Sequence, residues 1–358
     1  MPSQNNETKQ SSNDKNTQSP NLQISKSPNR PIALTGIKPT GTCHIGNYFG
    51  AIQPALELTQ DYDARYFIAD YHALNIIKNP ETIREYTYEV AATWLACGLD
   101  PDKTLVYRQS QVPETFDLST ILMAFTSKGL MNRAHAYKAM VQSNEEMGHD
   151  PDDGVNMGLF TYPVLMAADI LLFDSDVVPV GQDQAQHLEM TIDIAQSFNF
   201  NYGKELLTIP QPLIRKETKT VIGLDGRKMS KSYGNTIPMF LPTKKLRKLI
   251  MKIVTNSQTI EESKDPEVCN IFAIYKLFAD AAQQDALRKR YLAGGMGWGD
   301  AKQTLFEIIE AHITPIRERY EQIIADKTYI DQVLREGSVK AREIASRKIS
   351  FLKKEIGM

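Results

Sequence analysis

The stretch Thr35-Gly36-Ile37-Lys38-Pro39-Thr40-Gly41-Thr42-Cys43-His44-Ile45-Gly46-Asn47 decides the predicted fold. An apolar run at residues 31–34 precedes it, and residues 48–52 favour the start of a helix. The pattern therefore predicts a strand, a glycine-containing turn and a helix N-terminus. The free N–H groups and the positive dipole end of such a helix bind phosphate, and glycine lets a ligand approach the backbone. The imidazole of His44 and the amide of Asn47 add hydrogen-bonding groups there.

An ordinary turn with a structural histidine would give the same short pattern, because strand–turn–helix units with glycine are common in α/β proteins. A second motif far downstream, Lys228-Met229-Ser230-Lys231-Ser232, separates the two interpretations. The two motifs, in this order, resemble the HIGH turn and the KMSKS loop of class I aminoacyl-tRNA synthetases. The resemblance implies an ATP site in which Lys228 and Lys231 close over the leaving pyrophosphate.

Composition limits the other possibilities. The chain has 358 residues, of which 42% are hydrophobic and 23% charged, and a formal net charge of −2. It is long enough for two domains, and without overall positive charge any RNA contact must use local patches. Its three cysteines, Cys43, Cys97 and Cys269, are too scattered for a zinc or iron–sulfur site and suit a reducing compartment. No apolar run reaches membrane-spanning length.

Residues 1–30 are rich in Asn, Gln, Ser and Lys, and we expect them to form a disordered polar tail. A targeting peptide is the alternative interpretation. The segment has no apolar central region, however, and Glu7 and Asp14 are unlike an acid-poor transit peptide.

Residues 31–235 are predicted to form a doubly wound parallel sheet, a Rossmann-like catalytic domain. Apolar runs at 31–34, 64–69, 104–107 and 177–180 alternate with helical patterns. One helix is expected to begin after Asn79, with Pro80 in its first turn, and to end near Cys97 before Gly98. In such sheets ligands bind at the carboxyl ends of the strands, where the HIGH-type turn would lie.

Residues 236–358 are predicted to form an all-helical domain that binds tRNA, including its anticodon. Two basic runs support this: residues 242–255 have no acid, and the tail from Ser338 onward is also rich in lysine and arginine. The cations are Lys244, Lys245, Arg247, Lys248 and Lys252, then Lys340, Arg342, Arg347, Lys348, Lys353 and Lys354. A solvated helix surface is the plain alternative for each run. Beside a synthetase core, binding of the tRNA phosphate backbone is the prediction.

The mainly apolar segment 158–172 is predicted to be a helix with one carboxylate, Asp169. A buried carboxylate is costly unless it meets a hydrogen-bond donor. An arginine or a backbone cap would meet that need without any functional role. The alternative donor is the indole N–H of tryptophan, a group that can only donate.

This segment closely resembles the same part of bacterial-type tryptophanyl-tRNA synthetases, and the resemblance covers residues 31–358. Tyrosyl enzymes tend to carry Gln where this chain has Met166, and a thioether suits an indole face. A site strongly rejects an amino acid whose binding would leave a buried polar group of the site without a hydrogen bond. Asp169 and Met166 together therefore favour tryptophan over tyrosine.

The resemblance also implies the individual site residues. The catalytic ones are Lys228, Lys231, His44 and Lys38. The ATP site comprises Lys38, Pro39, Thr40, His44, Gly46, Asn47, Gly181, Gln182, Asp183, Val221, Lys228, Met229, Ser230, Lys231 and Ser232. The tryptophan site comprises Asp169, Met166, Tyr162, Gln184, His72, Val178, Val180 and Leu34. Asp183 is expected to bind the ribose, and Tyr162 and Gln184 the polar end of the amino acid. His72 is the least specific of these, because a lone histidine after a strand is more often structural.

Lys38 departs from the family's common pattern, in which a Gln stands in a Ser-Gly-x-Gln-Pro-Ser-Gly stretch. A lysine there can touch the α-phosphate itself and change how strongly the reaction depends on Lys228 and Lys231. The HIGH-type motif ends in Asn47, as is usual for tryptophanyl enzymes.

The resemblance implies a ligase that activates L-tryptophan with ATP and Mg²⁺, releases pyrophosphate and transfers the amino acid to the 3′-terminal adenosine of tRNA-Trp, first to its 2′-hydroxyl. It further implies a cytoplasmic homodimer. Two alternatives stay open: a non-catalytic paralogue that senses tryptophan or binds RNA, and a tyrosyl-tRNA synthetase. The intact KMSKS loop argues against the first. A small-molecule adenylyltransferase fits less well, because such enzymes are shorter and lack the loop and the helical region.

Overall fold

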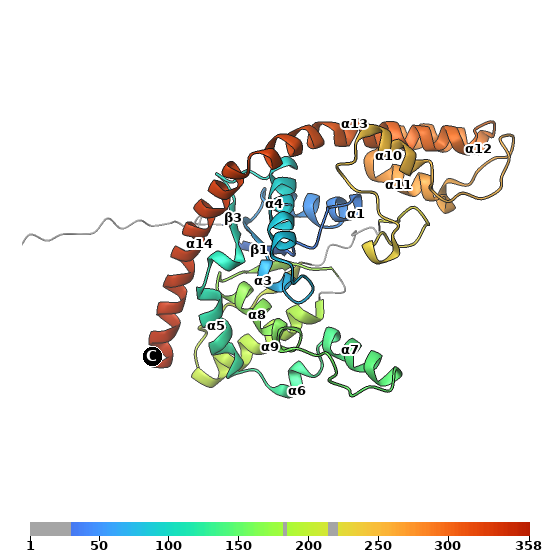
Figure 1. The fold of residues 1–358 in the computed structure, drawn as a ribbon. Helices are drawn as coiled ribbons and strands as arrows, with labels where there is room; N and C mark the ends of the chain where they lie inside the picture. Colours follow the sequence, from blue (N-terminus) through green and yellow to red (C-terminus); the bar gives the residue numbers. More distant parts are fainter. Residues whose placement is uncertain (1–29, 182–184, 214–220) are drawn as a thin grey trace, which may run out of the picture.

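The computed structural model describes residues 30–181, 185–213 and 221–358 and is built around one parallel sheet (Figure 1). Its strands are β1 (Ile32–Ile37), β2 (Asp63–Ile68), β3 (Leu105–Arg108), β4 (Val177–Pro179) and β5 (Gln211–Leu213). They lie in the order β3-β2-β1-β4-β5, and each pairs in parallel with its neighbours. The predicted doubly wound parallel sheet is confirmed. The predicted tail falls outside the described residues, apart from Arg30.

The strand register places the predicted chemistry at one edge of the sheet. Ile37 pairs with Ile68, and Ile68 pairs in turn with Arg108, so these three strands end level with one another. The next residues along the chain are Lys38, the α3 segment that begins at Asp70, and Gln109. The strand order reverses at β1, between β2 and β4, which is where doubly wound sheets bind their ligands.

The helix after the HIGH-type turn begins earlier than expected and contains a π turn. It comprises α1 (Ile45–Asn47), the π-helical η1 (Tyr48–Ile52) and α2 (Gln53–Leu58). His44 is its N-cap: the ring accepts a hydrogen bond from the Asn47 N–H, and the Asn47 side chain accepts one from the His44 N–H. This reciprocal cap fixes the first turn. Single π turns inside helices occur frequently at functional sites.

Helices cover both faces of the sheet. They are α3 (Asp70–Ala73), α4 (Pro80–Ala96), η2 (Gln109–Gln111), α5 (Glu114–Met123), α6 (Lys128–Met131), α7 (His135–Glu146), α8 (Met157–Leu171) and α9 (Ala185–Tyr202). One apolar core joins β2, α4 and the helix after His44. The other lies between the sheet and α5, α8 and α9. The prediction for α4 is confirmed, including Asn79 as its N-cap.

The regular elements of the C-terminal region are all helices, as predicted, with a loop between Ile250 and Pro266. After η3 (Lys231–Tyr233) come α10 (Thr243–Ile250), η4 (Pro266–Val268), α11 (Asn270–Phe278), α12 (Ala281–Ala293), α13 (Trp298–Ala325) and α14 (Lys327–Ile356). Helices α10 to α13 extend the first core away from the sheet, whereas α14 turns back along it (Figure 1).

Helix α14 lies directly on the outer edge of β3. A Cβ atom at Gly337 would meet the carbonyl oxygen of Val106 at 1.6 Å, so only glycine permits this approach. Three cations that the sequence marked as basic tail pair with acids beside the sheet: Arg342 with Glu114, Lys348 with Asp174 and Lys353 with Asp117. The three pairs join α14 to elements beside the sheet. Arg342 and Lys353 also remain largely exposed, so binding of tRNA by this helix stays a prediction.

Candidate active site

The HIGH-type turn and the KMSKS loop are in direct contact. The Lys231 ammonium donates to the Thr40 carbonyl at 3.0 Å, and the Gly46 N–H lies 3.3 Å from the Met229 sulfur. The chain just after the KMSKS motif also contacts the turn, because the Ile45 N–H donates to the Ile237 carbonyl at 2.9 Å. Residues more than 180 positions apart in the sequence therefore form one site.

Asn235 holds the KMSKS loop in shape. Its side-chain oxygen accepts from the Ser230 N–H at 2.8 Å, and its amide nitrogen donates to Asp225 at 2.7 Å and to the Lys228 carbonyl at 3.1 Å. The Lys228 and Lys231 side chains remain exposed, while Met229 is buried beneath them. The loop thus presents two ammonium groups on a fixed backbone.

Val221 begins the strand-like entry to this loop. It is buried, and its carbonyl accepts from the Met229 N–H at 2.8 Å. Ile222 then pairs with Lys228 as an isolated antiparallel bridge. The structure therefore brings Val221 together with the loop, and its contact with adenine stays a prediction.

His44 is buried at the start of the helix, and its Nδ1 accepts the Asn47 N–H at 3.3 Å. Burial, and secondarily the nearby Lys231 charge, lowers the pKa of His44 to about 4. The ring is therefore neutral near pH 7. Because Nδ1 is occupied as an acceptor, Nε2 carries the proton and can donate to a ligand.

Lys38 follows β1 and reaches across the site, with its ammonium 5.7 Å from the centre of the Tyr162 ring. Its side chain keeps contact with solvent, yet the surrounding protein lowers the pKa of the ammonium. The negative face of an aromatic ring attracts such a cation, whereas burial is what lowers the pKa of the Lys38 ammonium. Tyr162 in turn shares a hydrogen bond between its hydroxyl and Nε2 of His187.

Asp169 lies in the apolar part of α8 and is 1% exposed. The side chain of Gln109 donates to both carboxylate oxygens, at 3.0 and 2.8 Å, and Nε2 of His72 lies 3.0 Å from Oδ2. The alternative of an arginine or a backbone cap is therefore wrong among the described residues. Burial raises the pKa of Asp169, and the bonds from His72 and Gln109 oppose that rise.

The other residues predicted for the tryptophan site differ in burial. Leu34 and Val178 are buried, and Met166, Tyr162 and Val180 are partly exposed. The His72 and Tyr162 rings meet edge to face, with their centres 6.3 Å apart. Gly181 is described, whereas the predicted positions Gln182, Asp183 and Gln184 lie outside the described residues.

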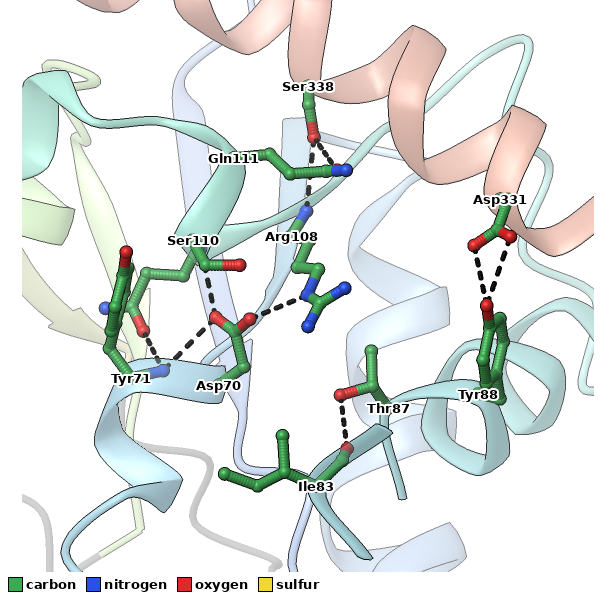
Figure 2. Close-up of polar contacts among 11 residues, drawn as sticks. Asp70, Tyr71, Ile83, Thr87, Tyr88, Arg108, Ser110, Gln111, Asp331 and Ser338 are labelled. Carbon is green, nitrogen blue, oxygen red and sulfur yellow. Dashed lines mark hydrogen bonds and ion pairs between the residues drawn. The ribbon is translucent and has the colours of Figure 1, made fainter. Parts of the chain in front are cut away.

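Three polar residues of the site were missed by the sequence reasoning: Asp70, Arg108 and Gln109. Asp70 accepts from the Arg108 side chain at 2.7 Å and from the Ser110 N–H at 3.0 Å (Figure 2). Arg108 ends β3, Gln109 follows it directly, and Asp70 comes two residues after the end of β2, all at the ligand-binding edge. That position is the signal that could have identified them.

The described residues contain no group of three or more His, Cys, Asp or Glu side chains arranged to hold a metal ion. Within the same residues, no helix is both long enough and apolar enough to cross a bilayer.

A family model described as tRNA synthetases class I (W and Y) matches residues 26–314. The chain belongs to this family of class I aminoacyl-tRNA synthetases. It is 50% identical over 328 residues to the tryptophan–tRNA ligase of Xanthomonas axonopodis pv. citri, with 91% of this chain and 76% of the relative covered. The tryptophan–tRNA ligase of Pseudomonas aeruginosa is 49% identical over 329 residues, which cover 91% and 73% of the two chains.

Among solved structures, the tryptophanyl-tRNA synthetase of Campylobacter jejuni complexed with ADP and tryptophan superposes on this chain with a TM-score of 0.84. The two sequences are 42% identical, and the superposition covers 91% of this chain and all of the other. The predicted family and fold are confirmed.

Proposed function

We propose that this enzyme is a tryptophan–tRNA ligase: it converts L-tryptophan and ATP to tryptophanyl-adenylate and pyrophosphate, then transfers the amino acid to the 3′-terminal adenosine of tRNA-Trp. The observation that carries the proposal is the buried Asp169 carboxylate, 1% exposed, in the same site as the joined turn and loop. The identity of about one half to tryptophan–tRNA ligases supports the choice of amino acid.

In the first step, a carboxylate oxygen of tryptophan bonds to the α-phosphorus while the bond from that phosphorus to the bridging oxygen of pyrophosphate breaks. The chain aligns these groups and balances the negative charge that grows on the leaving group. Lys228 and Lys231 supply positive charge on the pyrophosphate side, and Ser230 and Ser232 supply donors. Lys38 supplies positive charge from the opposite side, next to the α-phosphate.

The nucleotide rests on the HIGH-type turn in this proposal. The Gly46 and Asn47 N–H groups are taken up by the Met229 sulfur and the His44 ring. The donors to the phosphates are therefore the neutral His44, through Nε2, and the side-chain amide nitrogen of Asn47. Pro39 and Thr40 form the wall to which Lys231 is already bonded. Gly181, Gln182, Asp183 and Val221 complete the adenosine side.

Tryptophan binds with its indole N–H donating to Asp169. Met166, Val178, Val180 and Leu34 contact the indole faces, and His72 lies beside the carboxylate. Tyr162 and Gln184 bind the ammonium end. A phenol O–H can also donate to a carboxylate, so the preference over tyrosine rests on Asp169 together with Met166, whose thioether suits an indole face.

Magnesium enters as part of the MgATP substrate. The described residues offer no acidic cluster for a separate ion, and Mg²⁺ commonly keeps waters and binds phosphate oxygens with few protein ligands. The lysine-lined site fits such a bound phosphate chain.

The tRNA phosphate backbone binds to the helical region. Lys244, Lys245, Lys248 and Lys252 are exposed on and just after α10, which has no acidic side chain. Helices with this charge distribution bind phosphate backbones through salt-dependent contacts. Residues 31–235 act as the catalytic part and residues 236–358 as the tRNA-binding part, and α14 of the second part packs on β3 of the first. The enzyme works as a cytoplasmic homodimer.

An exchange assay over a panel of amino acids tests the function. We expect tryptophan-dependent exchange of pyrophosphate into ATP and at most trace exchange with tyrosine or phenylalanine. Robust exchange with tyrosine alone would support the tyrosyl alternative. Tight binding of tryptophan or tRNA without any exchange would support a non-catalytic paralogue.

The pH dependence of exchange reports on His44. Its pKa is lowered from 6.5 to about 4, so the folded enzyme keeps this ring neutral as the pH falls from 8 to 5. Protonation below that range would break the bond from the Asn47 N–H to Nδ1. We therefore expect the ratio of kcat/KM for ATP between the wild type and His44→Asn to stay constant from pH 5 to 8. A ratio that falls with a midpoint near 6.5 would contradict a neutral His44.

A further inference from the structure

Gln109 has only one possible orientation in the site. Its side-chain oxygen accepts the Tyr71 backbone N–H at 3.1 Å, and a backbone N–H can only donate. The amide nitrogen must therefore point at Asp169, where it lies 3.0 Å from Oδ1 and 2.8 Å from Oδ2. Gln109 is itself fully buried, at 0% exposure. Its amide cannot ionise and cannot accept the indole proton in place of Asp169.

The η2 turn that carries Gln109 is locked to α3, which carries His72. Asp70 at the start of α3 accepts from the Ser110 N–H and from the Arg108 side chain, and it also accepts its neighbour Tyr71's N–H at 3.1 Å (Figure 2). Asp70 is 4% exposed. The α3 segment with His72 and the η2 turn with Gln109, which both contact Asp169, are therefore joined to each other by hydrogen bonds.

The outer side of the same turn is held by α14. The Ser338 hydroxyl donates to the Gln111 side-chain oxygen at 2.8 Å and accepts the Arg108 N–H at 3.4 Å (Figure 2). Ser338 lies next to Gly337, whose contact with the Val106 carbonyl brings the helix this close. β3 is an edge strand, so α14 supplies the partner that a further strand would otherwise give to Arg108.

We propose that Gln109 is a positioning residue for tryptophan recognition, which aims the Asp169 carboxylate at the indole N–H, and that α14 holds the Gln109 turn in place through Ser338. The proposal rests on the function given above, because it requires Asp169 to bind the indole. The two donors of Gln109 fix the plane of the carboxylate and leave its remaining lone pairs for the substrate. Without the two Gln109 donors, the carboxylate can rotate toward His72, and its hydrogen bond to the indole N–H lengthens or is lost.

The test uses the discrimination between tryptophan and β-(benzothiophen-3-yl)alanine, in which sulfur replaces the indole N–H at nearly equal size. The discrimination ratio is kcat/KM for tryptophan divided by kcat/KM for this analogue, both from pyrophosphate exchange. For the wild type we expect a ratio of about 10 to 100, the value of one hydrogen bond to a charged acceptor. In Gln109→Met the ratio should fall by about tenfold, because the carboxylate loses both of its amide donors.

Ser338→Ala should lower the same ratio by about threefold, since it loosens the turn without touching Asp169. Two matched controls should keep the wild-type ratio: Ser350→Ala, an exposed serine on the same helix, and Gln142→Met, an exposed glutamine on α7. Where Gln109→Met fails to fold, Gln109→Asn provides the second variant, because it keeps the amide but shortens its reach. Its ratio should also fall.

The outcomes separate this proposal from the function on which it rests. A wild type without tryptophan-dependent exchange overturns the proposed function. If the wild type discriminates but the Gln109 variants keep its ratio while losing overall rate, Gln109 is only structural and the positioning role is overturned. A wild-type ratio in Ser338→Ala overturns the part assigned to α14.

Discussion

Replacing Asp169 with alanine is expected to lower kcat/KM for tryptophan by about 10²- to 10⁴-fold. The carboxylate is buried among apolar residues of α8, so the variant leaves the indole N–H facing a site without an acceptor. It also leaves the Gln109 amide without its partner, which adds to the loss. Steady-state pyrophosphate exchange measures the effect.

The same variant should lose its preference for tryptophan over the sulfur analogue, because both ligands then meet a site without a carboxylate. Asp193→Ala, an exposed aspartate on α9, is the control and should behave as the wild type. A variant at Asp169 that keeps wild-type kcat/KM and wild-type discrimination would rule out the proposed indole contact.

Replacing Lys231 with alanine is expected to slow adenylate formation by about 10²- to 10³-fold, the usual cost of removing one donor that meets charge developing in the transition state. Lys231 is one of the groups through which the KMSKS loop contacts the HIGH-type turn, at the Thr40 carbonyl. Its loss removes both a positive charge and that contact. Single-turnover measurement of tryptophanyl-adenylate formation separates this step from product release.

Tryptophan affinity should be unchanged in Lys231→Ala, because the lysine lies on the phosphate side of the site. Lys103→Ala, which removes an exposed lysine paired with Asp100, should have no effect on the rate. A fall of less than about fivefold would mean that Lys38 supplies most of the positive charge that stabilises the triphosphate. In that case Lys38→Gln should make the reaction strongly dependent on Lys231.

The motifs predicted the phosphate side of the site well because its elements are local. Strand, turn and helix start lie within one short stretch, and the KMSKS loop is a continuous motif of its own. The resemblance implied that the loop closes over the triphosphate, and the structure adds a direct contact from Lys231 to the Thr40 carbonyl that the sequence did not predict. The π turn at residues 48–52 was not predicted, because the same residues fit an ordinary helix.

The partners of Asp169 could not be predicted in the same way. Asp169 was recognised because one carboxylate stands in an apolar helix, but its donor Gln109 follows a strand 60 positions away. Which side chains meet at a sheet edge depends on strand order and register, and the sequence shows neither directly. β5 was missed for a related reason: Gln211-Pro212-Leu213 is short and scarcely apolar.

The basic tail shows the limit of charge patterns. A run of lysines and arginines has the same appearance whether it faces RNA, water or acids elsewhere in the protein. Arg342, Lys348 and Lys353 meet acids on α5 and on the segment before β4, more than 170 positions earlier in the chain. Only the folded arrangement reveals those partners.

The position of α14 on β3 has a consequence for biosynthesis. Ser338 and Arg108 are 230 positions apart, and α14 follows every other described element in the chain. A ribosome therefore completes the sheet long before it produces the helix that covers the outer strand. During that interval the nascent protein displays an open strand edge of the kind that pairs with neighbouring chains, and rapid docking of the last helix ends this exposure.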